Sequence, residues 1–534
     1  MARDRQIHRP PIRSSVPPIL LAGLLICAAW SVPQAASGNE TQPSIPLPGL
    51  KDHAKEMRDS LYHRALDYLM RYRQDDLGQA VRLFNQILLT HPDFAPSYGG
   101  LAEGRALRYL WGWEPDPDQL KRGVAQGRKG VELGPEMAET HLGLGLALMA
   151  SERYTPALAE LDRAVELDPD SFRAHLYRGM LLHGLRRTGE LGREVTRIFQ
   201  LDSASAVAYS LLGDYYQDSH QYTLSRDSYL TASLLDQHLL WARAGLATAY
   251  QRGLNYGSAV KTNSLTARDF PEEILRCRIM QASLFVSAQY YEDALNLYQQ
   301  IAESEKLSPP LLRRLILAGR GYALEKTGNM EKAEYYYNRL LEEFPEDFDG
   351  AVRDREVVSQ GVEGLLRYYD GKGAAKRSKE VLERTCRHPG MSFKLYRALA
   401  ERRQASGDLA GSVAVLGLGV ASAPEGLDFV SASEASLRVV RGLAARGVSA
   451  RAREAGLKLL ENLEDRLSQD PSTTYVPYLN LARCEALLKR DPRVISHLQL
   501  ALDKGFSGAT KLAEDSDFDS LHRNPDFQKL TARP

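Results

Sequence analysis

Residues 138–171 read AETHLGLGLALMASERYTPALAELDRAVELDPDS, and the same residue classes return every 34 residues as far as Pro271. The small residues at this interval are Gly145, Gly179, Gly213 and Ala247. A second set of mostly small residues follows each of them by 12 positions, namely Ala157, Leu191, Ser225 and Ala259. Self-similarity with a period of roughly 20 to 50 residues is typical of repeat architectures. A period of 34 predicts stacked helical hairpins.

Each repeat divides into two helical segments. Residues 140–147 and 156–167 carry apolar side chains at helical intervals, and a polar turn near residues 151–153 separates them. Two helices that pack closely need small residues where their axes approach, so we expect Gly145 to face Ala157 and Ala164. The larger Leu161 then fills the gap beneath. Pro169 cannot continue a helix interior and ends the second helix.

The pattern resembles the tetratricopeptide repeat family. The unit 138–171 matches most fully, with Leu144-Gly145, Ala157, Leu161, Ala164 and Pro169 at the family's positions. The resemblance implies an all-α fold, a superhelical solenoid of antiparallel helix pairs. It implies little about activity, because fold and function are separable and this family is mostly used for binding.

The predicted organisation has five parts. We expect a signal peptide or signal anchor in residues 1–38, a linker in 39–59, a tetratricopeptide array in 60–348 and divergent helical repeats in 349–505. The whole should contain about ten to twelve hairpins. Residues 506–534, with Asp517-Phe518-Asp519 and Asn524-Pro525-Asp526-Phe527, resemble the segment that closes tetratricopeptide arrays in many bacterial proteins. Its physical task would be to cap the apolar end of the last hairpin.

The first forty residues have the features of an export signal. Four arginines, at positions 3, 5, 9 and 13, precede an uninterrupted apolar run from Ile19 to Trp30, and small residues follow around Ala35. Twelve apolar residues are fewer than the roughly 20 that span a bilayer as a helix. We therefore expect a cleaved signal and a periplasmic or secreted protein. A membrane anchor formed by residues 16–36 is the alternative, and it is the only membrane contact we expect.

The sequence contains no motif that points to catalysis. It has no His-Glu-x-x-His pair, phosphate-loop lysine or paired-cysteine zinc spacing, so we predict no enzyme, no cofactor and no metal site. His141 and His175 stand 34 residues apart, which packing explains better than metal binding. The formal net charge is zero, with 68 basic and 68 acidic residues, so nucleic acid is not an expected partner.

The resemblance also implies which residues face a partner. In this family, the first helix of each pair lines the concave groove with its second, fifth, ninth and twelfth positions. The candidate binding residues are Glu139, Arg173, Asp214, Gln217, Trp241, Gln251 and Tyr322, and apolar neighbours such as Leu142, Leu146 and Leu176 would line the same groove. Trp241 either anchors a ligand or packs against the preceding helix. An ordinary solvated surface is the plain alternative for the whole set.

Residues 111–117 form an insertion with two tryptophans, which either contacts a partner or packs on the neighbouring hairpin. Two function classes follow. The first is an exported scaffold that binds a protein or peptide partner through its concave groove. The second is a regulatory or accessory subunit of an envelope enzyme or transport complex. A stoichiometric enzyme partner on co-purification would favour the second class.

Overall fold

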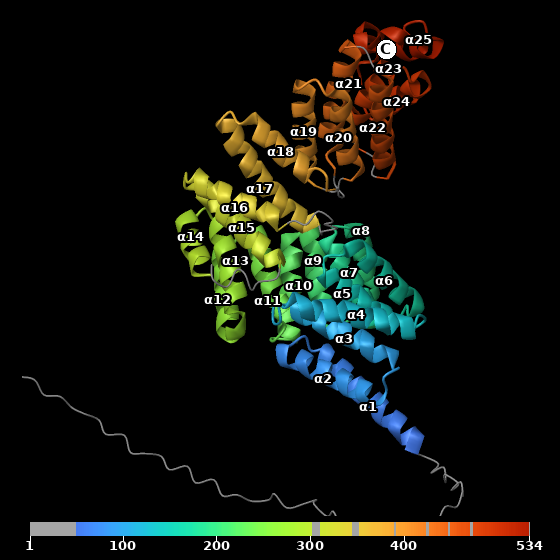
Figure 1. The fold of residues 1–534 in the computed structure, drawn as a ribbon. Helices are drawn as coiled ribbons and strands as arrows, with labels where there is room; N and C mark the ends of the chain where they lie inside the picture. The colour runs from blue at the N-terminus through green and yellow to red at the C-terminus, as the bar shows by residue number, and fades with distance from the viewer. Residues whose placement is uncertain are drawn as a thin grey trace, which may run out of the picture. The chain divides into compact units, whose positions relative to one another are not determined.

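The computed structural model describes residues 50–301, 310–343, 352–388, 391–422, 427–446, 449–469, 472 and 474–532. Helices α1 to α24 follow one another in an all-α superhelical solenoid (Figure 1), and the described residues contain no strand. The first four helices are α1 (Leu50–Leu69), α2 (Gln74–Thr90), α3 (Ala95–Leu110) and α4 (Pro117–Leu133).

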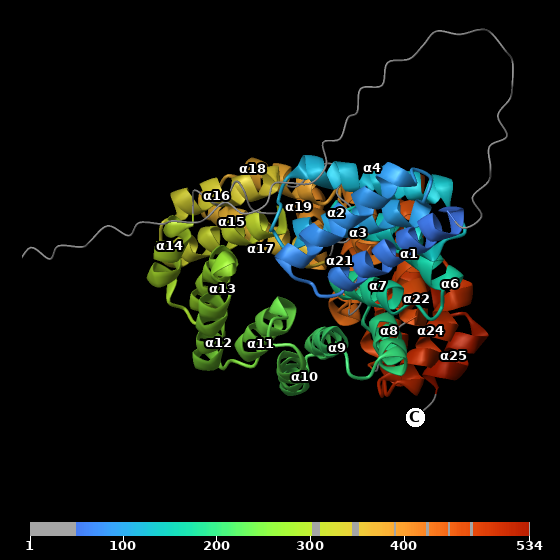
Figure 2. The same cartoon turned by 90° about the horizontal axis from the view of Figure 1, so that it is seen from below.

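The regular repeats occupy the next eight helices, and their starts keep the 34-residue interval. They are α5 (Ala138–Ala150), α6 (Tyr154–Leu167), α7 (Phe172–Gly184), α8 (Thr188–Leu201), α9 (Ala206–Asp218), α10 (Tyr222–Leu235), α11 (Leu240–Arg252) and α12 (Tyr256–Asp269). Figure 2 shows α9 to α12 as a succession of neighbouring helices.

The later helices are less regular in length. They are η1 (Pro271–Glu273), α13 (Ile274–Ser287), α14 (Tyr291–Gln300), α15 (Pro310–Lys326), α16 (Met330–Glu342), α17 (Val352–Gly371), α18 (Ala375–Thr385), α19 (Phe393–Ala405), α20 (Leu409–Ala421), α21 (Phe429–Arg446), α22 (Ala450–Gln469), α23 (Val476–Leu487) and α24 (Asp491–Asp503). After α24 come η3 (Ala509–Glu514), η4 (Ser516–Leu521) and α25 (Pro525–Thr531).

The turn inside each regular pair contains one residue in the left-handed conformation. These residues are Glu152, Arg186, His220 and Leu254, with φ between 58° and 60°, and they also recur every 34 positions. In the first of these turns, the Arg153 N–H donates to the Leu148 carbonyl at 3.0 Å. This bond and the left-handed residue before it define a Schellman turn, which satisfies the last carbonyls of the first helix.

Glycines set the distance between paired helices, as the repeat predicts. A Cβ placed on Gly145 would lie 2.8 Å from Leu161 Cγ, and one on Gly213 would lie 2.7 Å from the Tyr229 ring. Gly179 instead abuts Leu211 of the following pair, at 2.6 Å. These are close contacts that a side chain would disrupt.

Two large apolar cores fill the solenoid, one from Tyr62 to Ala242 and one from Leu317 to Leu530. Between them, the described residues hold two small clusters, around Tyr229 and Leu246 and around Ile279 and Tyr298. Helices α11 and α13 are correspondingly less buried than α5 and α7. The middle of the array therefore presents more of its helix surface.

The N-terminal end of the array begins earlier than the sequence predicted. Helix α1 begins at Leu50, whereas the sequence predicted a linker to residue 59, because the helix-breaking pair Pro48-Gly49 is the last such signal before it. The predicted signal, residues 1–38, lies outside the described residues. Among the described helices, none is long and apolar enough to cross a membrane. At the other end, Phe518 and Phe527 are buried in the same core as α23.

Candidate protein-binding face

The seven candidate residues come from the first helices of their pairs, and we call the side that carries them the candidate face. Asp214 and Gln217 are buried, each 8% exposed, and the other five are partly buried. They are Glu139 on α5, Arg173 on α7, Asp214 and Gln217 on α9, Trp241 and Gln251 on α11, and Tyr322 on α15.

The early part of the expected groove is closed. Leu142, Leu146 and Leu176 are at most 1% exposed and belong to the core, so the prediction that they line a groove is wrong. Helices α3 and α5 approach so closely that a Cβ on Gly143 would lie 2.1 Å from the Gly99 carbonyl oxygen. This contact covers α5, whose every residue except Glu139 is buried.

Arg173 is engaged inside the molecule. Its guanidinium donates to Glu103 at 2.6 Å, and the Tyr177 hydroxyl donates to the same carboxylate at 2.7 Å. The Tyr72 and Tyr177 hydroxyls are 3.3 Å apart. Burial, together with the Glu103 charge, raises the pKa of Tyr177 well above its ordinary value. Arg173 therefore balances a buried carboxylate, which is 1% exposed, and is not available to a ligand.

Asp214 and Trp241 are brought together as neighbours on adjacent pairs. The Trp241 indole N–H donates to one Asp214 oxygen at 3.2 Å, and the Tyr229 hydroxyl donates to the other. His183 lies between Asp214, at 3.4 Å, and Asp218, at 2.6 Å. Trp241 also packs on the large N-terminal core and stays partly exposed. This geometry supports the packing alternative for Trp241, and part of the side chain stays at the surface.

The candidate face is most accessible from α11 to α15. Gln251 donates to the Ser287 hydroxyl at 2.7 Å, and both side chains lie near the surface. The Tyr322 ring lies 6.2 Å from the Tyr291 ring and 5.0 Å from the Lys326 ammonium nitrogen. The Gln251–Ser287 and Tyr322–Tyr291 contacts bridge successive pairs without fully burying the side chains. This section offers aromatic, amide and hydroxyl groups together.

Sequence reasoning missed His183 and Glu103. His183 belongs to the buried network around Asp214, and Glu103 belongs to the buried network around Arg173. The signal was present, because His183 stands at the twelfth position of its unit, one of the positions that the family resemblance assigns to the groove. Glu103 stands at the ninth residue of α3. Tyr229 could not be found in this way, since it belongs to a second helix.

The tryptophan insertion packs on the chain itself. Trp111 and Trp113 stack with their rings 5.9 Å apart, the Trp113 indole donates to Glu273, and the Arg276 guanidinium lies 5.4 Å from the Trp111 ring. Glu273 lies 160 residues after Trp113 in the chain. The packing alternative expected the tryptophans to pack on the neighbouring hairpin, and they pack instead on this distant segment. A similar long-range ion pair joins Arg186 to Glu356 at 2.9 Å.

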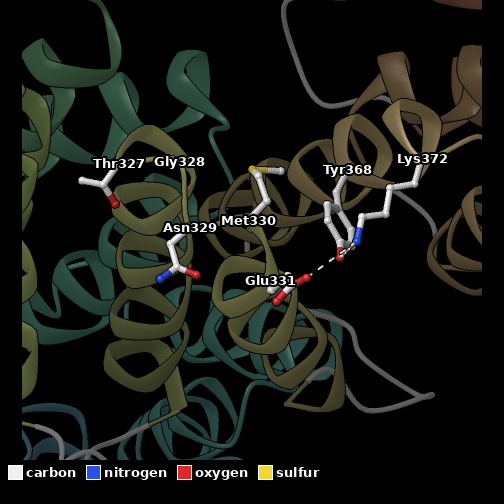
Figure 3. Close-up of a pocket in the computed structure, with 7 residues that line it drawn as sticks. All are labelled: Thr327, Gly328, Asn329, Met330, Glu331, Tyr368 and Lys372. Atoms are coloured by element: carbon white, nitrogen blue, oxygen red, sulfur yellow. Dashed lines mark hydrogen bonds and ion pairs between the residues drawn. The ribbon is translucent and has the colours of Figure 1, made fainter.

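Two surface pockets accompany these contacts. One, of about 600 Å³, lies between the α1–α2 turn, Trp113 and Phe270. The other, of about 570 Å³, is an open pocket beside the α15–α16 turn (Figure 3). There the Lys372 ammonium group donates to the Tyr368 hydroxyl at 2.7 Å and lies 3.9 Å from Glu331. Its single lysine pairs with its neighbours, so this pocket lacks a converging set of reactive groups.

Two segments of the chain match the tetratricopeptide repeat family model, residues 142–190 and 279–348. Tetratricopeptide repeats are therefore present, and the prediction from residue spacing is confirmed for these segments. These segments make up a minority of the chain. No curated protein sequence is significantly similar to the chain.

Several solved structures are similar to parts of the chain. MamA from Desulfovibrio magneticus has 19% identity over 31% of this chain and 90% of its own, with a TM-score of 0.25. A thermophilic tetratricopeptide protein of Thermus thermophilus has 18% identity over 36% and 98%, with a TM-score of 0.29. PilF of Pseudomonas aeruginosa has 17% identity over 40% and 95%, also with a TM-score of 0.29. Similarities this low carry no inference about partner or activity.

Proposed function

We propose that this chain is an exported scaffold that binds a protein or peptide partner through the part of the candidate face between α11 and α15. The observation that carries the proposal is the partly exposed Trp241, whose indole N–H is fixed by Asp214. An indole held in one orientation loses little entropy on binding, and tryptophan contributes strongly to protein interfaces.

The chemistry of this section suits a polypeptide better than a small metabolite. Gln251 and Ser287 can exchange their mutual hydrogen bond for bonds to a partner's backbone. Tyr322 adds an aromatic surface near Lys326. The groups are spread over three first helices and do not converge on one enclosed cavity, which favours an extended segment or a helix as the ligand.

Export rests on the N-terminal residues. The four arginines and the apolar run from Ile19 to Trp30 support transfer across a membrane. Sequencing of the mature N-terminus should place it between Ser31 and Asn39. A chain that retains residues 16–36 in the membrane fraction would select the anchor, and a cytosolic chain beginning at Met1 would exclude export.

The binding proposal is tested with paired variants in a pull-down from the envelope fraction. Gln251→Ala and Tyr322→Ala should each reduce capture of the partner. Gln300→Ala and Tyr335→Ala change the same residue types at exposed positions on the second helices α14 and α16 and should leave capture intact. Equal capture by all four variants would move the site elsewhere. If the captured partner is a stoichiometric enzyme, the chain is its accessory subunit.

A further inference from the structure

Three ionisable side chains converge where α22, α23 and α24 pack together. Glu464, Glu485 and His497 each offer a ligand atom, and these atoms all lie within 4.8 Å of one another. Glu485 is fully buried, His497 is 8% exposed, and the Glu464 side chain is 15% exposed. Buried acidic groups are costly unless they are paired or coordinate a metal.

Two other buried histidines, His141 and His175, use their ring nitrogens in a different way. His141 and His175 each hold one glutamate through Nδ1, at 2.6 and 2.7 Å, while Nε2 lies 2.9 Å from a backbone carbonyl oxygen. One carboxylate and one carbonyl satisfy the whole imidazole, so these are structural pairs. The His497 ring differs from these two and resembles His183, because its Nδ1 lies 2.7 Å from Glu485 and its Nε2 lies 3.3 Å from Glu464. Among the described residues, no backbone carbonyl contacts either His497 nitrogen in the same way.

Glu485 has an oxygen that this pairing leaves unused. Its Oε2 contacts His497, whereas its buried Oε1 has no hydrogen-bond partner among the described residues. A buried, unpaired carboxylate oxygen costs free energy that a ligand would recover. On Glu464, Arg490 and Arg493 contact Oε2, and Oε1 is the atom that faces His497. The imidazole ring of His497 thus lies between an oxygen of Glu485, which faces Nδ1, and an oxygen of Glu464, which faces Nε2.

We propose that Glu464, Glu485 and His497 bind a divalent metal ion, with Zn²⁺ as the best match. One imidazole nitrogen and two carboxylate oxygens form a donor set that zinc accepts, and water can complete the coordination. Zinc–ligand distances of about 2.0 to 2.2 Å place tetrahedral ligand atoms roughly 3.3 Å apart. The separation of 3.3 Å between His497 Nε2 and Glu464 Oε1 already has this value.

The neighbouring arginines set the affinity. Arg490 and Arg493 place positive charge beside Glu464, which opposes a cation. Arg493 has a half-exposed side chain and can turn to solvent. Arg490 forms a second ion pair with Glu461 at 3.9 Å, which helps to hold it in place. Arg493→Gln should therefore tighten zinc binding several-fold. The ring nitrogen that binds the metal must be free of its proton.

The bound ion would connect three helices at the last hairpin. Zinc added to the metal-depleted chain should raise its melting temperature, since a ligand that binds only the folded state stabilises it. The effect should be confined to α22–α24, and hydrogen exchange should slow there and remain unchanged in α5–α8.

The test is titration of the full-length chain, depleted of metal with EDTA, with ZnCl₂ in a calorimeter. Wild type should bind zinc saturably, and Glu485→Gln should weaken binding about 10- to 100-fold. Glu194→Gln, which breaks the structural pair of His175, is the matched control and should bind zinc like wild type. X-ray absorption should give a first shell of nitrogen and oxygen with an imidazole contribution that His497→Gln removes.

Two results would overturn the proposal. Zinc binding of equal strength in wild type, Glu485→Gln and His497→Gln would mean an adventitious ion only. The absence of saturable binding in folded wild type would mean that the cluster is a network of ion pairs. Circular dichroism checks that each variant is folded, and Glu464→Gln replaces any variant that is not. None of these results depends on the partner-binding face.

Discussion

Glu152 accepts two hydrogen bonds from the guanidinium of Arg314, a residue 162 positions later in the chain. Arg314 is almost fully buried on α15, and Glu152 is the left-handed residue in the α5–α6 turn. The pair therefore joins two hairpins that are far apart in the repeat. Trp113 and Glu273 make a contact of the same span. These contacts connect the N-terminal core to the section that carries the candidate face.

Loss of this pair should destabilise the array. Glu152→Gln removes the charge that accepts two hydrogen bonds from buried Arg314, and weakening a buried ion pair in this way should cost about 2 to 4 kcal/mol of unfolding free energy. Glu136→Gln breaks the exposed pair with Arg163 and should cost less than about 1 kcal/mol. Urea unfolding of both variants measures the difference, and equal midpoints would contradict the importance of the long-range pair.

The left-handed turn residues predict a stabilising substitution. Leu254 has φ of 60° and is exposed, so it incurs a backbone cost that glycine avoids. Leu254→Gly should raise stability by about 0.5 to 1 kcal/mol. Leu234→Gly makes the same exchange at an exposed position inside α10 and should lower stability by about 1 kcal/mol. If thermal unfolding shifts both variants in the same direction, the turn assignment is wrong.

Close helix contacts predict opposite outcomes for two glycines. A Cβ on Gly143 would meet the Gly99 backbone, whereas one on Gly257 in α12 would meet no atom within 4 Å. Gly143→Ala should destabilise the chain by about 3 kcal/mol, because backbone must move. Gly257→Ala should stabilise it by about 0.5 to 1 kcal/mol.

Gly179→Leu should also destabilise, typically by about 1 to 3 kcal/mol, although leucine favours helix. The expected cost arises from Leu211, whose Cδ2 would lie 2.6 Å from the added Cβ. Denaturant midpoints give the comparison with Gly143→Ala. A raised midpoint for Gly179→Leu would contradict the assigned packing.

The buried cysteines should be unreactive in the folded protein. Burial raises the pKa of the Cys277 thiol to about 11 and that of Cys386 to about 12. A thiol reagent at pH 8 should modify them only after unfolding. Because the folded state holds these protons more tightly, their contribution to stability is present below pH of about 9 and falls as the pH rises toward 11. Rapid modification of Cys386 at pH 8 without unfolding would contradict its burial.

Sequence periodicity predicted the helix pairs because local spacing determines them. The 34-residue interval placed α5 to α12, and Gly145 and Gly213 were correctly assigned to close contacts. The position rule also selected Asp214 and Trp241, which the structure joins. It failed for Leu142, because whether a first helix faces a groove or a core depends on how closely a neighbouring pair approaches, here the preceding pair through Gly99 and Gly143.

The long-range contacts could not be predicted in the same way. Small rotations between successive pairs accumulate over several units, so the meeting of Glu152 with Arg314 depends on angles that the repeat does not specify. The cluster of Glu464, Glu485 and His497 was missed because its residues come from three helices with no metal-binding spacing. Spacing motifs detect only sites built within one or two local segments.

The most direct test of the binding face is site-specific photocrosslinking in the living cell. A photoreactive phenylalanine analogue replaces Gln251 on the candidate face or Gln300 on α14, and crosslinked proteins are identified by mass spectrometry. The account predicts that position 251 yields a defined protein adduct and that position 300 does not. Adducts of the same protein at both positions, or none at position 251 in a folded and exported chain, would contradict it.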